Sequence, residues 1–112
     1  MQYALLIYSQ PDALATPDEP EWAELNKEYW AIREVPGVST GAGLQPVETA
    51  TTVRLQDGKT LVTDGPFADT KEVLAGFYLY EADNLDQATE LAARIPAVRL
   101  GGSVEIRPVM VY

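Results

Sequence analysis

The chain has 112 residues, 46% hydrophobic and 22% charged, with a net charge of −9. This is the length and composition of a single soluble domain, residues 1–112, that can bury its own core. The sequence contains neither cysteine nor histidine, which excludes disulfides, thiolate chemistry, imidazole or thiolate metal ligands and histidine-based proton transfer. The acidic charge, with only eight dispersed lysines and arginines, argues against binding to nucleic acid or to an anionic membrane.

The N-terminal segment is apolar but does not resemble a targeting sequence. Met1–Tyr8 lacks the basic region and the cleavage site of a signal peptide. No apolar stretch reaches the roughly 18 residues that a transmembrane helix requires. We therefore expect no membrane association and a cytoplasmic protein.

The first half of the chain predicts a strand followed by a helix. Tyr3–Tyr8 is a short continuous apolar run, typical of a strand covered on both faces. Thr16–Glu19 has the pattern of a capping box, and Pro20 offers a competing start one turn later. Val35-Pro36-Gly37 ends the helix. Its apolar positions follow helical spacing at Trp22, Leu25, Tyr29 and Ile32.

One edge of this helix carries polar residues beside the apolar stripe. Asn26 and Arg33 fall next to the apolar arc, and Trp30 lies just beyond them. In one interpretation Arg33 packs its stem on the core and keeps its guanidinium in water. In the other, this edge overlooks a cleft between helix and sheet, and Arg33 binds an anion there.

The second half predicts mainly strands. Residues 38–44 form a short strand, residues 51–55 and 60–63 form a hairpin around Asp57-Gly58, and Leu74–Glu81 forms a further strand. In this last strand Phe77 and Leu79 share one side, and Gly76, Tyr78 and Tyr80 share the other.

A second helix and a final strand complete the chain. Asn84 is a suitable N-cap with Gln87 three residues later, and Pro96 ends the helix. Gly101-Gly102 is a turn, and the last strand is Ser103–Val111. The apolar stripe of this helix is Leu85, Ala88, Leu91, Ala92 and Ile95.

This order of elements predicts an α+β ferredoxin-like sandwich, an antiparallel sheet with two helices on one face. The opposite sheet face then carries tyrosines and β-branched side chains without a cover. Because a large apolar face rarely stays in water, we expect a homodimer in which two sheets pack face to face.

The segment Asp64–Glu72 has more polar groups than a turn between strands needs. Asp64 can accept hydrogen bonds from the amides of the Gly65-Pro66 turn, and Phe67 can anchor the loop. A carboxylate beside Lys71 could transfer protons. The same residues could equally form a solvated turn with a surface ion pair of little energetic weight.

These residues resemble the signature of YCII-related proteins of the DGPF type, and the resemblance extends over essentially the whole chain. It rests on Asp64-Gly65-Pro66-Phe67, Asp69-Thr70-Lys71-Glu72, Gly76-Phe77-Tyr78, Tyr3–Tyr8, Gly43–Pro46, Ala50–Arg54 and Gly102–Val109. It implies a dimeric α/β-barrel of ferredoxin-like subunits. Some YCII-type proteins are candidate enzymes because a histidine and an aspartate meet in a cleft, but this chain has no histidine for that pair. The family also implies a link to extracytoplasmic-function sigma factors.

Three functions follow as hypotheses. The first is binding of a small, anionic molecule, with or without weak catalysis, in a cleft between the first helix, the sheet and the Asp64–Glu72 loop. The second is a regulatory dimer that partners a sigma factor, and the third is a structural role. Asp64 and Lys71 are the catalytic candidates, and the ligand-binding candidates are Arg33, Asp64, Lys71, Glu72, Tyr78, Arg54 and Arg107.

Two of these candidates admit a second interpretation. Arg54 and Arg107 could face the dimer interface, where each needs a ligand carboxylate or an internal partner such as Glu105, which would set the register of the strands. Without histidine or cysteine only carboxylate sites for Mg²⁺ or Ca²⁺ remain, and no EF-hand spacing or phosphate-binding glycine loop occurs. We therefore expect no metal and no cofactor.

Overall fold

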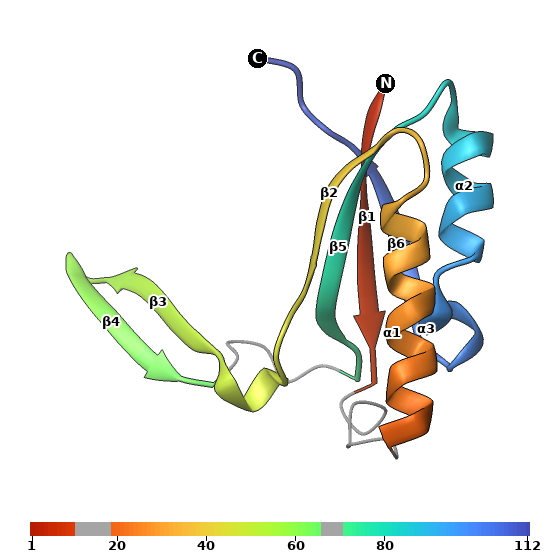
Figure 1. Ribbon diagram of the computed structural model, residues 1–112. Coiled ribbons are helices and arrows are strands. Elements are labelled where there is room, and N and C mark those ends of the chain that lie inside the picture. The colour runs from red at the N-terminus through yellow and green to blue at the C-terminus, as the bar shows by residue number, and fades with distance from the viewer. Residues whose placement is uncertain (11–18, 66–70) are drawn as a thin grey trace.

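The structure, a computed structural model, describes residues 1–10, 19–65 and 71–112 and has the α+β architecture predicted from the sequence (Figure 1). The N-cap proposed at Thr16 and the centre of the Asp64–Glu72 segment lie outside these ranges. The elements in chain order are β1 (Gln2–Ser9), α1 (Glu19–Arg33), β2 (Val38–Gly43), the 3-10 helix η2 (Val47–Thr49), β3 (Thr51–Gln56), β4 (Lys59–Asp64), β5 (Val73–Glu81), α2 (Leu85–Ala93), α3 (Pro96–Arg99) and β6 (Ser103–Pro108).

Four strands form one antiparallel sheet in the order β2-β5-β1-β6. The two central strands, β1 and β5, are not neighbours in the sequence, and each is followed by a helix that lies on the same side of the sheet (Figure 1). This is the ferredoxin-like arrangement, so the predicted fold class is confirmed.

The core lies between the helices and one face of the sheet. Burial alternates strictly along β1, and the same alternation in β5 places Tyr78 and Tyr80 inside while Phe77 and Leu79 face the opposite side. The predicted division of β5 is therefore confirmed. The expectation that β1 is covered on both faces is not met within one chain, because both helices pack on the same side. The buried cluster is Tyr3, Leu5, Ile7, Ile32, Tyr78, Tyr80, Ala82, Ala88, Leu91, Ile95 and Ala97.

The second helical region differs from the prediction at its end. Asn84 caps α2 as expected, because its side chain accepts a hydrogen bond of 2.9 Å from the amide of Gln87. Pro96 ends this helix but also begins the short helix α3, since proline suits the first position of a helix. The last strand stops at Pro108 rather than Val111, which is 96% exposed. Leu85 is also exposed, so it does not join the apolar stripe.

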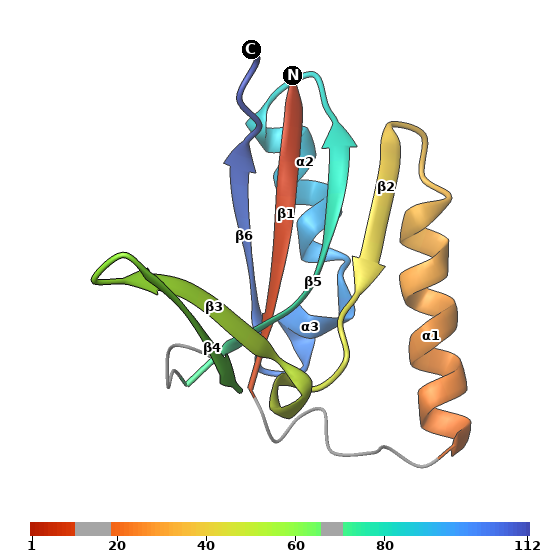
Figure 2. The same ribbon diagram turned by 90° about the vertical axis from the view of Figure 1, so that its left-hand side faces the viewer.

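The predicted hairpin forms, but it stands apart from the sheet. Asp57 and Gly58 both have positive φ, 51° and 76°, as a tight hairpin turn requires. Among the strands that the structure describes, β3 and β4 pair only with each other, in a separate two-stranded sheet. Figures 1 and 2 show this hairpin on the side of the main sheet opposite the helices. Within the described residues, no helix is both long and apolar enough to cross a membrane.

Candidate functional site

A cleft of about 470 Å³ separates α1 from strands β2 and β5. This size is typical of small-molecule sites, which are mostly apolar with a few polar groups. The helix forms one wall, and the backbone of β2 and the segment that follows it form the other. The lining residues are Ile7, Ser9, Trp22, Leu25, Asn26, Tyr29, Trp30, Arg33, Gly41, Ala42, Gly43, Leu44, Gln45, Pro46, Ala75, Gly76 and Tyr78.

The polar edge of α1 borders this cleft. Asn26, Trp30 and Arg33 all line it, which agrees with the second of the two interpretations, in which this edge overlooks a cleft between helix and sheet. The guanidinium of Arg33 lies over the ring of Trp30, 4.9 Å from its centroid. This contact holds the cation beside the cleft and contributes about 0.5–1 kcal/mol at an exposed position.

The sheet side of the cleft is anchored by Tyr78. Its hydroxyl donates a 2.8 Å hydrogen bond to the backbone oxygen of Tyr29, which ties β5 to α1 across the floor. Burial is the main cause that raises the pKa of Tyr78 to about 12, nearby Tyr29 adds to the rise, and Arg33 opposes it. Burial also raises the pKa of Tyr29, against the lowering effects of a hydrogen bond with the Ala97 backbone and of Arg99. Both phenols are therefore neutral hydrogen-bonding groups at neutral pH.

Two glycines of β2 shape the opposite wall differently. A Cβ on Gly41 would lie 2.5 Å from the Tyr78 ring, so only glycine permits this strand to pack on the tyrosine. A Cβ on Gly43 would meet nothing within 4 Å. Residues two apart on a strand share a face, so Gly43 faces the helix side and leaves the backbone of β2 open to the cleft.

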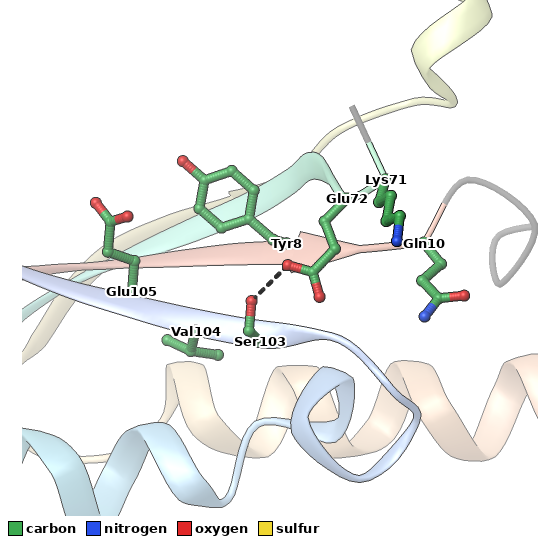
Figure 3. A pocket seen from close by; sticks show the side chains of 7 residues that line it. All are labelled: Tyr8, Gln10, Lys71, Glu72, Ser103, Val104 and Glu105. Atoms are coloured by element: carbon green, nitrogen blue, oxygen red, sulfur yellow. Dashed lines mark hydrogen bonds between the residues drawn. The ribbon is translucent and has the colours of Figure 1, made fainter. Parts of the chain in front are cut away.

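A second, shallower hollow of about 580 Å³ lies on the opposite face of the sheet (Figure 3). It is lined by Tyr8, Gln10, Lys71, Glu72, Ser103, Val104 and Glu105. The hydroxyl of Ser103 donates a 2.8 Å hydrogen bond to Oε2 of Glu72, which ties the start of β5 to β6. In Figure 3 the side chains of Tyr8, Glu72 and Glu105 stand on the side away from the helices, and Val104 points toward them.

The predicted ligand-binding residues are thus divided between two faces. Arg33 and Tyr78 line the cleft beside α1, whereas Lys71 and Glu72 line the hollow on the other face. Asp64 is exposed at the end of β4, and its backbone pairs with Thr51 at the base of the hairpin. The described residues therefore do not join Asp64, Lys71 and Arg33 around one cleft.

The two remaining arginines lie farther from the cleft. Arg54 is exposed on the hairpin, and Arg107 is exposed on β6. Nε of Arg107 lies 3.7 Å from Oε1 of Glu105, the partner considered from the sequence. The two side chains are 70% and 53% exposed, so the pair contributes little to stability. Because both residues belong to β6, the pair does not set the register between strands.

Sequence reasoning missed two residues of the cleft, Trp22 and Gly43. Trp22 was assigned to the apolar stripe, yet it is 51% exposed at the cleft, and Trp30 is 54% exposed. Gly43 was considered as part of a short strand and of the family resemblance, but not as a cleft residue. For Trp22, the available signal in the sequence was its position eight residues before Trp30 on a helix with a polar edge. The open space at Gly43 depends on how β2 and α1 pack, so no local pattern indicates it. Among residues that the structure describes, no group of three acidic side chains could hold a metal ion.

The comparisons with known proteins identify the family. The model of the YCII-related domain matches residues 1–112, the full length predicted for one domain. The chain belongs to the YCII-related family. An uncharacterized protein from Rhizobium meliloti is 34% identical over 117 residues, covering 100% of this chain and 94% of that protein.

A solved structure shares the fold of this YCII-related protein. It is the 5-chloro-2-hydroxyhydroquinone dehydrochlorinase TftG from Burkholderia phenoliruptrix AC1100, in complex with 2,5-dihydroxybenzoquinone. The match has a TM-score of 0.54 with 12% identity and covers 98% of this chain and 94% of TftG. TftG has the dimeric α/β-barrel fold, and at 12% identity the match shows that this chain shares the fold of its subunit, as the sequence resemblance implied.

Proposed function

We propose that this YCII-related protein binds a small, planar, negatively charged molecule in the cleft beside α1. The observation that carries the proposal is the pairing of two half-exposed indoles with a guanidinium along one helix edge. Trp22 and Trp30 are about 12 Å apart along the helix axis, at 1.5 Å per residue. That length suits a single ring with its substituents.

The chemistry of the cleft fits such a ligand. Tryptophan faces favour flat rings, and covering an exposed indole removes a large apolar area from water. Arg33 offers a planar fork of donors suited to a carboxylate or an acidic enol, and its stacking on Trp30 restricts its motion before binding. On the opposite wall the backbone of Gly43 leaves room for the ligand edge.

A protein of the same fold binds a molecule of this class. The TftG structure contains 2,5-dihydroxybenzoquinone, a planar ring with acidic hydroxyl groups. At 12% identity this likeness concerns the fold alone, so the residues that would recognise a ligand here are argued from this chain's own cleft. The catalytic candidates Asp64 and Lys71 do not line that cleft, so the proposal is limited to binding. The sigma-factor link implied by the family stays a prediction.

Isothermal titration with defined probes tests the proposal. 2,5-Dihydroxybenzoquinone and 2,5-dihydroxybenzoate are the planar anions, with uncharged hydroquinone and non-planar cyclohexanecarboxylate as ligand controls. We expect micromolar to submillimolar binding of at least one planar anion. Gly43→Leu should abolish it by filling the cleft, and Arg33→Gln should weaken it about tenfold by removing a charged hydrogen bond.

A matched control separates the site from general charge. Arg94→Gln removes one exposed cation at the end of α2, which does not line the cleft, and it should leave the affinity unchanged. Equal affinities in wild type, Gly43→Leu and Arg33→Gln would contradict the proposal. Absence of binding by both planar anions at millimolar concentration would contradict it as well.

We further propose that the protein forms a homodimer through the open sheet face. The two central strands contribute Ala4, Leu6, Tyr8, Phe77 and Leu79 to this face, and no helix among the described residues covers them. Glu105 and Arg107 of β6 lie beside these apolar side chains. A contiguous apolar surface of this kind is typical of an interface in a soluble protein. The dimeric fold of TftG supports a twofold assembly.

A further inference from the structure

The β3–β4 hairpin presents an apolar face that the described part of the chain leaves exposed. Val53, Leu55 and Val62 are 63%, 72% and 66% exposed. Val53 pairs directly with Val62, and Leu55 is two residues along the same strand, so the three side chains share one face. Every residue from Val53 to Asp64 is exposed.

A hairpin of this kind needs further contacts to be stable. An isolated two-stranded hairpin is at best marginally stable in water. Here it is connected to the body at its base, where the hydroxyl of Thr52 donates a 2.8 Å hydrogen bond to the oxygen of Gly65. The Cα radius of gyration is 15.7 Å, against about 13 Å expected for a compact chain of this length. The hairpin therefore projects from the body as an arm.

The direction of the arm indicates what covers it. Figures 1 and 2 both place it on the side of the open sheet face, away from the helices. A second copy docked on the open face by a twofold axis would occupy that side. Its body would then lie next to the arm.

We propose that each hairpin packs through Val53, Leu55 and Val62 against the other copy of the chain, so that both arms form part of the dimer interface. This inference rests on the homodimer proposed above and assigns the arm, rather than the sheet face alone, as part of the interface.

The area of the sheet supports this role. Four strands of six to nine residues give a face of roughly 450 Å², at about 4.8 Å between strands and 3.4 Å per residue. A standard stable interface buries about 800 Å² on each partner. The arm's two six-residue strands add roughly 200 Å², and the surface beneath the partner's arm adds about the same again. Together these contributions reach the standard size.

The charge of the arm also suits contact with a second acidic copy. Residues 51–64 contain two cations, Arg54 and Lys59, and two anions, Asp57 and Asp64, so this segment is neutral within a chain of net charge −9. Contact between the bodies alone would bring like charges together. A neutral apolar arm reaches the partner without adding to that repulsion.

Sedimentation equilibrium of designed variants tests the inference. The double variant Val53→Lys with Val62→Glu removes the apolar face but keeps a cross-strand pair of opposite charges and the net charge, so the hairpin itself is preserved. We expect the dimer dissociation constant to rise at least about 100-fold, since each valine left uncovered weakens association by about tenfold or more. Gln56→Glu places a charge on the other face of the arm, opposite Lys59, and should leave the dimer unchanged.

A third variant distinguishes failure of the arm from failure of the dimer. Phe77→Lys places a charge in the open sheet face and should dissociate the dimer independently of the arm. If Phe77→Lys dissociates it while the valine double variant matches wild type, the arm inference is overturned and the sheet-face dimer stands. If wild type is a monomer at every concentration, both proposals fail.

The lack of cysteine allows a direct test of position. Lys59→Cys introduces a unique thiol at the tip of the arm, where a spin label can be attached. In a mixture of spin-labelled chains with isotope-labelled wild-type chains, we expect the spin label to enhance the relaxation of those amide protons of the wild-type chain that lie near the partner's arm. Absence of any such relaxation enhancement between chains in a confirmed dimer would refute the inference.

Discussion

The close approach of β2 to Tyr78 predicts a large difference between two neighbouring glycines. Gly41 and Gly43 lie two residues apart on the same face of β2. In Gly41→Ala the new Cβ would stand 2.5 Å from Cδ1 of Tyr78 and 2.8 Å from the backbone oxygen of Phe77. Ordinary contact begins at 3.4 Å, so the tyrosine ring must retreat by about 0.9 Å, the difference between 3.4 and 2.5 Å.

The magnitude follows from what that retreat disturbs. The oxygen of Phe77 belongs to a strand paired with β2, and it cannot move without loss of the pairing. Tyr78 is 5% exposed and is tied to Tyr29 by its hydroxyl. Overpacking costs about 1–3 kcal/mol, and loss of the hydrogen bond costs about 0.5–1.5 kcal/mol. We expect Gly41→Ala to lower the free energy of unfolding by about 2–4 kcal/mol.

Gly43→Ala is the matched control. Its Cβ meets no atom within 4 Å and its φ is not positive, so the folded state accepts it. Because alanine restricts the unfolded chain more than glycine does, Gly43→Ala should leave the free energy of unfolding unchanged or raise it by up to about 1 kcal/mol. Urea denaturation followed by far-ultraviolet circular dichroism, at one protomer concentration for all variants, measures both. Free energies of unfolding that agree within about 0.5 kcal/mol would refute the packing argument.

The remaining predictions concern pH and helix capping. The pKa of Tyr78 is raised to about 12 in the folded state, from 10.0, so the folded protein holds this proton more tightly than the unfolded chain. The stabilisation from the protonated Tyr78 hydroxyl is therefore complete below pH 10 and is lost as the pH rises toward 12. In thermal melts at increasing pH, the melting temperature of Tyr78→Phe should fall less over this range than that of wild type. An equal fall in both proteins would contradict the assignment. Asn84→Ala should lower the free energy of unfolding by about 1 kcal/mol, or the melting temperature by about 4 °C, because it removes the cap of α2. Asn84→Asp should retain most of the stabilisation by the cap. Equal melting temperatures for Asn84→Ala and wild type would show that the cap is dispensable.

Elements with strong local signals were predicted correctly from the sequence. Asp57-Gly58 adopts the two positive φ values of a tight turn because these residue types tolerate them better than others. Asn84 caps α2 through a hydrogen bond to Gln87, only three residues away. The alternation of Tyr78 and Tyr80 with Phe77 and Leu79 assigns the faces of β5 directly, because successive strand residues point in opposite directions.

The arrangement of the candidate site was decided by tertiary structure. The sequence placed Arg33, Asp64 and Lys71 around one cleft, but the sheet separates Arg33 from Lys71, and Asp64 lies at the base of the hairpin. No local pattern distinguishes these outcomes, because each depends on which strands pair and on which side a loop leaves the sheet. The same holds for the separate position of the hairpin and for the short helix after Pro96.

The sequence by itself determined the family, the order of the six strands and two main helices, and the absence of histidine chemistry, since these depend on residue identity and local conformational preference. Only the tertiary structure brought Trp22, Trp30 and Arg33 to the rim of a cleft and left Val53 and Val62 uncovered. The physical reason is that clefts and exposed apolar faces arise where packed elements fail to cover one another. That property belongs to the assembled layers rather than to any segment of the chain.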